Sequence, residues 1–218
     1  MNRTITAITA QKNNPKRVNL YLDGEFACGL SRITATWLSV GQELTAEKIT
    51  HLKSEDEFET AYQKAINYIS YQPRTEQEVR QKLESKSYSD DVIDITIGKL
   101  LTIGLIDDQK FAKDWVDNRF EFRPRSKRAL SYELRRRGIQ ADSIEAAIED
   151  VDDSLMAYKA ASKQAHKYKA CDWGEYRKKM LGFLSRRGFS FEICAHTIKR
   201  IWDERILENK IYENEADI

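Results

Sequence analysis

Two patterns of hydrophobic and polar residues divide the chain. In the first thirty residues apolar and polar positions alternate, in Val18–Leu22 and again in Phe26–Leu30. Asp23-Gly24 separates these runs, and an Asp-Gly pair between alternating segments indicates a β-hairpin whose two turn residues take positive φ. Residues 4–10, ahead of the loop Asn13-Asn14-Pro15, are predicted to form a third strand. The chain therefore opens with a small antiparallel meander.

The meander needs a packing partner, because an isolated two-stranded hairpin is only marginally stable in water. The sequence offers two candidates, a short helix over Ile33–Leu38 and the first helical unit that follows it. Both alternatives remain open at the level of sequence.

From about Ser54 onward the apolar residues follow a helical period, and the helices repeat. Leu83, Leu134 and Leu184 lie 51 and 50 residues apart. When these leucines are aligned, the apolar positions around them agree in three further columns: Val79, Leu130 and Met180; Tyr88, Ile139 and Phe189; Ile97, Ile148 and Ile198. This agreement predicts three tandem copies of a three-helix unit.

Helix start and stop signals recur at matching places in these units. Proline followed by a capping hydroxyl stands at Pro73-Arg74-Thr75 and at Pro124-Arg125-Ser126. Unit three has Trp173-Gly174 there, so we expect its first loop to differ. The predicted capping boxes are Thr75 with Glu78, Ser54 with Glu57 and Asp142 with Glu145, and the predicted stops are Gly104, Gly138 and Gly188.

The predicted fold is mainly α, with three tandem three-helix repeats behind the small β-meander. Because a unit of this size has a small core, neighbouring units are expected to stack into an elongated curved array. The alternative is three beads on short linkers. The expected boundaries are 1–53 for the meander with short helices, 54–106, 107–153 and 154–207 for the repeats, and 208–218 for an acidic tail.

Composition supports a helical chain, since 33% of the residues are charged and only nine are glycine and three proline. No apolar run approaches the roughly eighteen residues of a membrane span, and the N-terminus is polar, so we expect a cytoplasmic protein without a membrane partner. The three cysteines, Cys28, Cys171 and Cys194, are odd in number and widely spaced, which is typical of reduced thiols.

The net charge is only +1, but basic and acidic residues are concentrated in different stretches of the chain. Between Arg123 and Arg137 there are seven basic residues and one acid, Glu133, whereas residues 142–153 carry six acids. At about 100° per residue, Arg125, Arg128, Tyr132, Arg135 and Arg136 share the helix face opposite Leu130 and Leu134. Arginine binds phosphates and carboxylates in bidentate fashion, so we predict a partner-binding or DNA-binding surface rather than an ordinary solvated face. The candidate residues are Arg123, Arg125, Lys127, Arg128, Tyr132, Arg135, Arg136, Arg137, Lys178, Lys179, Arg186 and Arg187.

Signals for catalysis, cofactors and metals are weak. The sequence contains no G-x-S-x-G, P-loop or Gly-rich dinucleotide motif. His166, Cys171, Cys194 and His196 fall within one unit but lack the close cysteine pair of a structural zinc site. We therefore expect neither catalytic residues nor cofactors.

The four tryptophans, Trp37, Trp115, Trp173 and Trp202, are spread along the chain, and we expect them to have structural positions in the core.

Three motifs resemble the RecX family of bacterial regulatory proteins: Gly104–Trp115, Arg123–Ser126 and Glu133–Ile139. The resemblance implies three tandem three-helix repeats and a non-enzymatic modulator of the RecA recombinase. It further implies that the protein lies in the groove of the RecA filament on single-stranded DNA and limits its ATPase, strand-exchange and coprotease activities. Such binding requires only a monomer.

Two other interpretations stay open. Three-helix units with a basic helix also resemble helix-turn-helix readers, and the second interpretation is therefore an autonomous nucleic-acid-binding protein. The net charge near zero argues against it. The third interpretation is a protein-interaction adaptor whose basic patches meet acidic partner surfaces.

Overall fold

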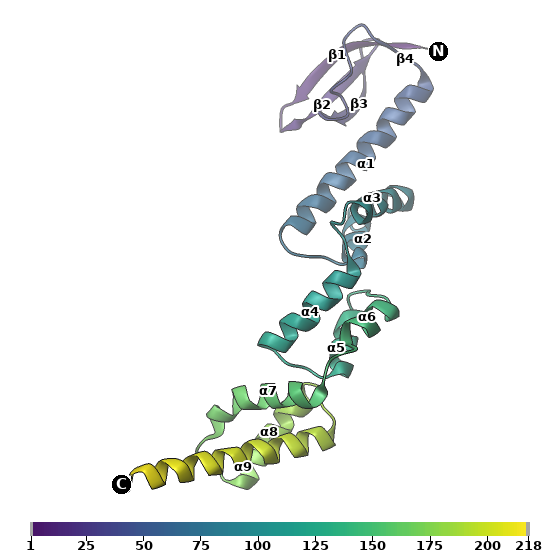
Figure 1. The fold of residues 1–218 in the computed structure, drawn as a ribbon. Coiled ribbons are helices and arrows are strands. Elements are labelled where there is room, and N and C mark those ends of the chain that lie inside the picture. Colours follow the sequence, from purple (N-terminus) through teal and green to yellow (C-terminus); the bar gives the residue numbers. More distant parts are fainter. Residues whose placement is uncertain (1, 217–218) are drawn as a thin grey trace. The chain divides into compact units, whose positions relative to one another are not determined.

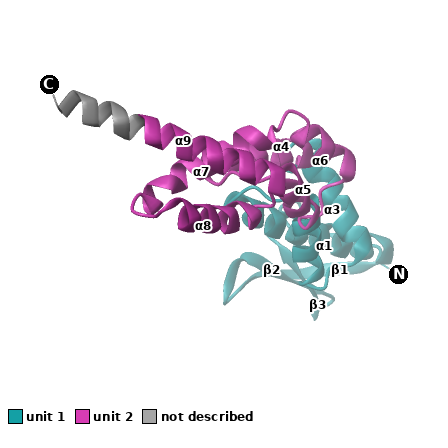
Figure 2. Ribbon diagram, turned by 90° about the horizontal axis from the view of Figure 1, so that it is seen from below, with its two compact units in different colours: residues 1–106 teal, residues 107–218 magenta. Residues whose placement is uncertain are grey.

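The protein begins with β-strands and continues as a series of helices in a computed structural model (Figure 1). The structure describes residues 2–216, and side chains are described for residues 2–207. The chain divides into two compact units, residues 1–106 (unit 1) and 107–218 (unit 2) (Figure 2). The order of helices confirms the predicted mainly α fold with three three-helix repeats behind an N-terminal antiparallel sheet.

The sheet of unit 1 has the order β3-β2-β1-β4, and its strands pair antiparallel. The strands are β1 (Arg3–Gln11), β2 (Asn14–Leu22), β3 (Glu25–Ser31) and β4 (Glu43–Leu44). The predicted hairpin is confirmed, because Asp23 and Gly24 have φ of 52° and 85° between β2 and β3. The preceding turn is formed by Lys12-Asn13, so Asn14 and Pro15 belong to β2 rather than to a loop.

The predicted helix over Ile33–Leu38 is wrong, since residues 32–37 form successive turns. The Ser31 hydroxyl accepts a hydrogen bond from Thr34 N at 3.0 Å, as an N-cap residue does. The backbone bonds that follow, from Thr36 N to the Ile33 carbonyl and from Leu38 N to the Ala35 carbonyl, each span three residues and form separate turns in place of a regular α-helix. The segment then returns to the sheet as β4. Trp37 lies in these turns and is 55% exposed, so its predicted place in the core is also wrong.

The sheet packs instead on the first helix, α1 (Ala46–Ser70), which was the other candidate. This helix begins eight residues before Ser54, and its N-cap Thr45 accepts a hydrogen bond from Lys48 N at 3.2 Å. The predicted capping box at Ser54 and Glu57 is therefore wrong, because Ser54 lies inside the helix. Leu52 of α1 belongs to the apolar cluster under the sheet, whereas Ala61 and Ala65 belong to the core of repeat 1.

Repeat 1 consists of the second half of α1 with α2 (Glu76–Glu84) and α3 (Asp90–Thr102). The capping box at Thr75 and Glu78 is confirmed by both of its hydrogen bonds. The aligned residues Val79 and Leu83 are fully buried, and together with Ile93, Ile97, Leu100 and Ile106 they close a core around Ala61 and Ala65.

Unit 2 contains repeats 2 and 3. Repeat 2 has α4 (Asp108–Phe122), α5 (Lys127–Arg135) and α6 (Ala141–Ile148). Repeat 3 has α7 (Asp153–Ala165), a 3₁₀ turn η1 (His166–Tyr168), α8 (Trp173–Ser185) and α9 (Phe191–Ala216). The side chains of the predicted acidic tail, residues 208–218, lie outside the described part of the chain, as do residues 217 and 218 entirely.

Three helices of unit 2 begin at N-cap residues that the sequence patterns did not predict. The predicted capping box at Asp142 and Glu145 is wrong, because Gln140 occupies the N-cap of α6 and Asp142 lies in the first turn. In repeat 3, where proline is missing, Asp172 caps α8 by accepting from Glu175 N at 2.8 Å. In the acidic stretch near position 150, Asp152 is the N-cap of α7, and its carboxylate accepts a hydrogen bond from Ser154 N.

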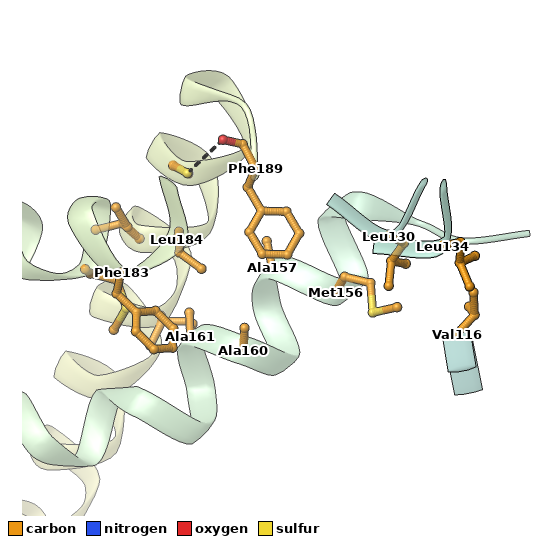
Figure 3. Close-up of a cluster of buried hydrophobic side chains, with 14 of the residues drawn as sticks. Val116, Leu130, Leu134, Met156, Ala157, Ala160, Ala161, Phe183, Leu184 and Phe189 are labelled. Atoms are coloured by element: carbon orange, nitrogen blue, oxygen red, sulfur yellow. Dashed lines mark hydrogen bonds between the residues drawn. The ribbon is translucent and has the colours of Figure 1, made fainter. Parts of the chain in front are cut away.

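Repeats 2 and 3 share one continuous apolar core. Figure 3 shows Met156 of α7 beside Leu130, Leu134 and Val116 of repeat 2. Ala157, Ala160 and Ala161 of the same helix lie among Phe183, Leu184 and Phe189 of repeat 3 (Figure 3). Within unit 2 the repeats are therefore packed on one another through α7 rather than strung as separate beads.

Candidate anion-binding groove

The start of α5 is held by residues from both repeats of unit 2. Ser126 is fully buried at the N-cap, and its hydroxyl accepts from Ala129 N at 3.2 Å. Its own backbone N–H donates to the carbonyl of Arg187, which follows α8, at 3.1 Å. Asp153 of α7 accepts from Lys127 N at 2.6 Å and places a negative charge at this helix N-terminus. The loop after α8 is thus docked on the beginning of α5.

Gly188 makes this close approach sterically feasible. A Cβ at this position would lie 2.5 Å from the Ser126 hydroxyl oxygen and 3.0 Å from Ala129 Cβ. Its φ of +90° is also a conformation that glycine adopts without strain. The residue predicted as a helix stop therefore also joins repeat 3 to repeat 2, and it brings its neighbour Arg186 next to α5.

The docked loop and α5 enclose a groove of about 600 Å³ on the surface of unit 2. We call this the arginine groove. Its lining residues come from both repeats: Arg125, Arg128, Ala129, Tyr132, Glu133, Arg136, Ser185, Arg186 and Gly188. Tyr132 is 61% exposed, and the Arg136 guanidinium carbon lies 5.9 Å from its ring centroid. The groove therefore combines cations with an accessible aromatic ring.

Positive charge concentrates around Arg187, which stands in the chain between the lining residues Arg186 and Gly188. Its guanidinium carbon lies 3.7 Å from the ring centroid of Phe183. Burial lowers the pKa of Arg187, and the charges of Arg125, Arg186 and Arg123 lower it further. Like charges held this close repel one another, so a bound anion would stabilise the arrangement.

Glu133 is the counter-charge that positions part of this cluster. Its carboxylate accepts from Arg125 Nε at 2.8 Å, from Arg119 Nε at 2.8 Å and from Trp115 Nε1 at 2.9 Å. Only 17% of its side chain is exposed. Among the described residues, in contrast, Arg128, Arg136 and Arg186 form no ion pair with a carboxylate. These three arginines therefore offer their charge and N–H donors to a ligand.

The remaining predicted site residues lie outside the groove lining. Lys127 Nζ donates to the carbonyl of Glu149 at 2.8 Å, and Arg135 donates to the Ser131 hydroxyl at 3.2 Å. Arg137 is stacked on Trp115 at 4.2 Å, and Lys179 is paired with Glu175 at 2.7 Å. Arg123 and Lys178 are exposed. The structure thus gathers Arg125, Arg128, Tyr132, Arg136 and Arg186, with Arg187 and Arg123 close by.

Sequence reasoning missed the residues that hold the cluster. Arg119 lies 4.1 Å from the Trp115 ring and shares Glu133 with Arg125. Glu133 was visible as the single acid in a basic stretch, which was a signal for a structural ion pair. The contact of Gly188 with Ser126 joins residues 62 positions apart, and no local pattern reports such a contact.

Residues 2–207 contain no group of three or more His, Cys, Asp or Glu side chains placed to hold a metal ion. Cys194 is buried and its thiol points to the Phe189 carbonyl at 3.8 Å. No helix in the described part of the chain combines the length and the apolar character that a membrane crossing requires.

Comparison with known protein families identifies all four parts of the chain. The model of the RecX regulatory protein N-terminal domain matches residues 3–45. The models of the first, second and third three-helix domains of RecX match residues 61–100, 107–148 and 155–198. These matches coincide with the sheet and with the three repeats.

Individual relatives align with this chain over nearly its full length. The regulatory protein RecX of Bacillus pumilus is 32% identical over 204 residues, covering 91% of this chain and 78% of that protein. The regulatory protein RecX of Clostridium perfringens strain SM101 is 28% identical over 211 residues, covering 94% and 99%. A crystal structure of regulatory protein RecX superposes with a TM-score of 0.67 at 27% identity, covering 91% of this chain and 99% of that one. The RecX structure from Lactobacillus salivarius gives a TM-score of 0.58 at 29% identity and covers 67% of this chain.

The fold defines a class of proteins with tandem three-helix repeats behind a small antiparallel sheet. In this chain a basic groove lies where repeats 2 and 3 meet. Within that class, the chain belongs to the RecX family. Its homologues are named regulatory proteins, which supports a regulatory role for this chain.

Proposed function

We propose that this protein binds the RecA filament on single-stranded DNA in the cytoplasm and limits its ATPase, strand-exchange and coprotease activities. The family supports a regulatory role, and the arginine groove is the observation that supports the mode of binding. The protein acts by occupying the filament as a monomer and not by catalysing a reaction.

The groove suits the phosphates of a single strand for two reasons. Its unpaired guanidinium groups offer planar, bidentate donors that match phosphate oxygens. Its exposed aromatic ring, Tyr132, can stack on a base without reading its identity, as in proteins that bind single strands without sequence preference. We accordingly assign the contacts with DNA in the filament to Arg125, Arg128, Tyr132, Arg136, Arg186 and Arg187.

The direct test adds the protein to RecA assembled on single-stranded DNA and follows ATP hydrolysis. We expect hydrolysis to fall as the protein is added. The double variant Arg128→Glu with Arg186→Glu should need a roughly tenfold higher concentration for half inhibition, because two attractive contacts become repulsive. An unchanged rate of hydrolysis at saturating wild-type protein would contradict the proposal.

A matched control separates the groove from a general effect of charge. Lys110 and Lys113 are exposed residues of α4 in the same unit, and they lie outside the groove lining. The double variant Lys110→Glu with Lys113→Glu changes the net charge by the same amount and should inhibit like the wild type. Equal loss in both double variants would show that the arginine groove has no specific role.

Binding without RecA distinguishes the alternative of an autonomous nucleic-acid-binding protein. That alternative requires tight binding to DNA alone, with an affinity that falls steeply with salt. Under our proposal, the affinity for the filament exceeds the affinity for the bare strand at the same salt concentration. Equal affinities would favour the alternative.

A further inference from the structure

The turns after β3 carry two adjoining hollows on the surface of unit 1. The first is an apolar groove of about 550 Å³, whose lining includes Ile8, Val18 and Val40. The second is a polar cleft of about 780 Å³ between the start of β2, the end of β3 and the middle of α1. Arg32 and Ile33 line both, so the two hollows form one surface, which we call the N-terminal groove.

The apolar part of this surface is unusually accessible. Ile33 and Val40, which line the apolar groove, are 60% and 65% exposed, and Trp37, which lies between them in the chain, is 55% exposed. Exposed apolar residues gathered in one place on a folded protein mark a binding site more often than isolated ones do.

The polar part brings three cations together. The backbone N–H of Arg32 donates to the carbonyl of Lys16 at 2.9 Å, so the first residue after β3 lies beside Lys16 of β2. Like charges held this close repel one another. Lys64 of α1 lines the same cleft, with its Nζ 4.9 Å from the Tyr88 ring centroid. Within the described part of the chain, Lys16, Arg32 and Lys64 form no ion pair with a carboxylate.

The other charges of the cleft leave an excess of positive charge. Arg17 is already paired with Asp56 at 2.8 Å and holds the carbonyl of Gly29. The carboxylate of Glu59 accepts from Gln63 Nε2 at 3.0 Å. The lining of the cleft therefore holds three cations without a carboxylate partner and a single carboxylate, that of Glu59, beside an apolar groove.

We infer that the N-terminal groove binds an acidic, amphipathic segment of a partner protein. Apolar side chains of the segment lie against Ile8, Ile33 and Val40, and its carboxylates pair with Lys16, Arg32 and Lys64. A nucleic acid strand would use the cations but would leave the aliphatic groove uncovered, so a peptide fits the whole surface better. This inference concerns unit 1 and does not depend on the arginine groove or on the filament.

The test uses the full chain and a short labelled synthetic peptide in which Leu and Glu alternate, followed by fluorescence anisotropy. A peptide that alternates Leu and Lys is the charge-reversed probe. We expect the acidic peptide to bind, the basic peptide to fail, and the affinity to fall as salt is raised. The double variant Lys16→Glu with Arg32→Glu should bind about tenfold more weakly.

Two further variants make the result interpretable. Lys12 is exposed in the turn between β1 and β2 and lines neither hollow, so Lys12→Glu should bind like the wild type. Ile33→Asp removes an exposed apolar contact shared by both hollows and should also weaken the acidic peptide about tenfold. An unchanged midpoint of urea unfolding shows that each variant remains folded.

Three results would overturn the inference. The first is equal binding of the acidic and basic peptides, and the second is an unchanged affinity in both Lys16→Glu with Arg32→Glu and Ile33→Asp. In the third, single-stranded oligo(dT) displaces the peptide from the wild type and fails to bind the double variant, which would make the cleft a nucleic-acid site. Because no arm contains RecA, failure here leaves the filament proposal intact.

Discussion

At the scale of single residues, the end of the second helix is formed differently in repeat 1 than in the other two repeats. Gly138 and Gly188 follow α5 and α8 with φ of 82° and 90°. The matching residue after α2 is Ser87, which takes φ of 60° although it carries a side chain. A left-handed conformation costs an L-residue about 1–2 kcal/mol, whereas glycine adopts it freely.

Ser87→Gly should therefore stabilise unit 1. We expect the free energy of unfolding to rise by roughly 0.5–1 kcal/mol, after the larger chain entropy of glycine in the unfolded state is subtracted. Urea unfolding measures the change. Ser85→Gly is the matched control. Ser85 has φ of −61°, so glycine at this position should lower the free energy of unfolding of unit 1. Loss of stability in Ser87→Gly would contradict this account.

Gly188→Ala should be among the more damaging small substitutions in unit 2. It adds the left-handed strain and also a Cβ that would meet Ser126 and Ala129, so we expect a loss of about 2–4 kcal/mol. Gly104→Ala is the control, since it has φ of +70° but its Cβ would meet open space among the described residues. Thermal or urea unfolding of both variants separates strain from clash, and equal losses would argue against the close contact.

Glu133→Gln tests the buried carboxylate of the arginine groove. The amide keeps the shape but removes the charge that holds Arg119 and Arg125, so two partly buried cations lose their partner. We expect a loss of about 2–3 kcal/mol in the free energy of unfolding. Glu175→Gln, which breaks an exposed pair with Lys179, should cost much less, because solvent screens that pair. Unfolding curves that show the same cost for both would contradict the structural role of Glu133.

At the scale of elements, α1 is the feature that ties the sheet to repeat 1. Leu52 near its start packs under the sheet, and Ala61 and Ala65 pack in the core of the repeat. A continuous helix of 25 residues transmits the position of one cluster to the other. The sheet and repeat 1 should therefore open together rather than separately.

Glu57→Gly places a flexible residue in the exposed middle of α1. Relative to Glu57→Ala, it should destabilise unit 1 by about 1 kcal/mol, because glycine is a poor helix former. Hydrogen exchange gives the sharper readout: amides of β2 and of α3 should both exchange faster in the glycine variant. Acceleration confined to one of the two clusters would show that they open independently.

At the scale of the whole molecule, opposed patches of charge account for a net charge of only +1. Part of the acidic charge serves the fold, since Asp152 caps α7 and Asp153 binds the start of α5. Among the described residues, Arg128, Arg136 and Arg186 of the arginine groove form no ion pair with a carboxylate. Affinity for a phosphate backbone should therefore depend on salt much more strongly than the net charge indicates.

The salt dependence of filament binding offers a quantitative check of the proposed function. Each phosphate contact with a single strand contributes about 0.7 to the slope of log K against log salt. The variant Arg128→Gln with Arg186→Gln should reduce this slope by roughly 1.4 if each arginine makes one such contact. Lys113→Gln is the control and should leave it unchanged. A slope that is the same in all three proteins would remove these arginines from the DNA contact.

Much of the fold could be predicted because it rests on short-range physics. The Asp23-Gly24 hairpin, the capping box at Thr75 and the glycine stops each depend on residues within a few positions of one another. The three apolar columns repeated at 51 and 50 residues were visible for the same reason. The start of α1 was missed, because the apolar residues of its first half face a sheet and not the repeat that defined the period.

By itself, the sequence determined the class of fold, the number of repeats and the helix that carries the arginines, because each follows from local periodicity and composition. The tertiary structure alone decided which arginines gather. The docking of Gly188 on Ser126 brings Arg186 into the same groove as Arg128. Other predicted site residues contact the protein itself: Lys127 binds the Glu149 carbonyl, Arg137 stacks on Trp115, and Lys179 pairs with Glu175. Angular position on one helix says which residues face away from the core, but only contacts between distant segments determine what those residues face.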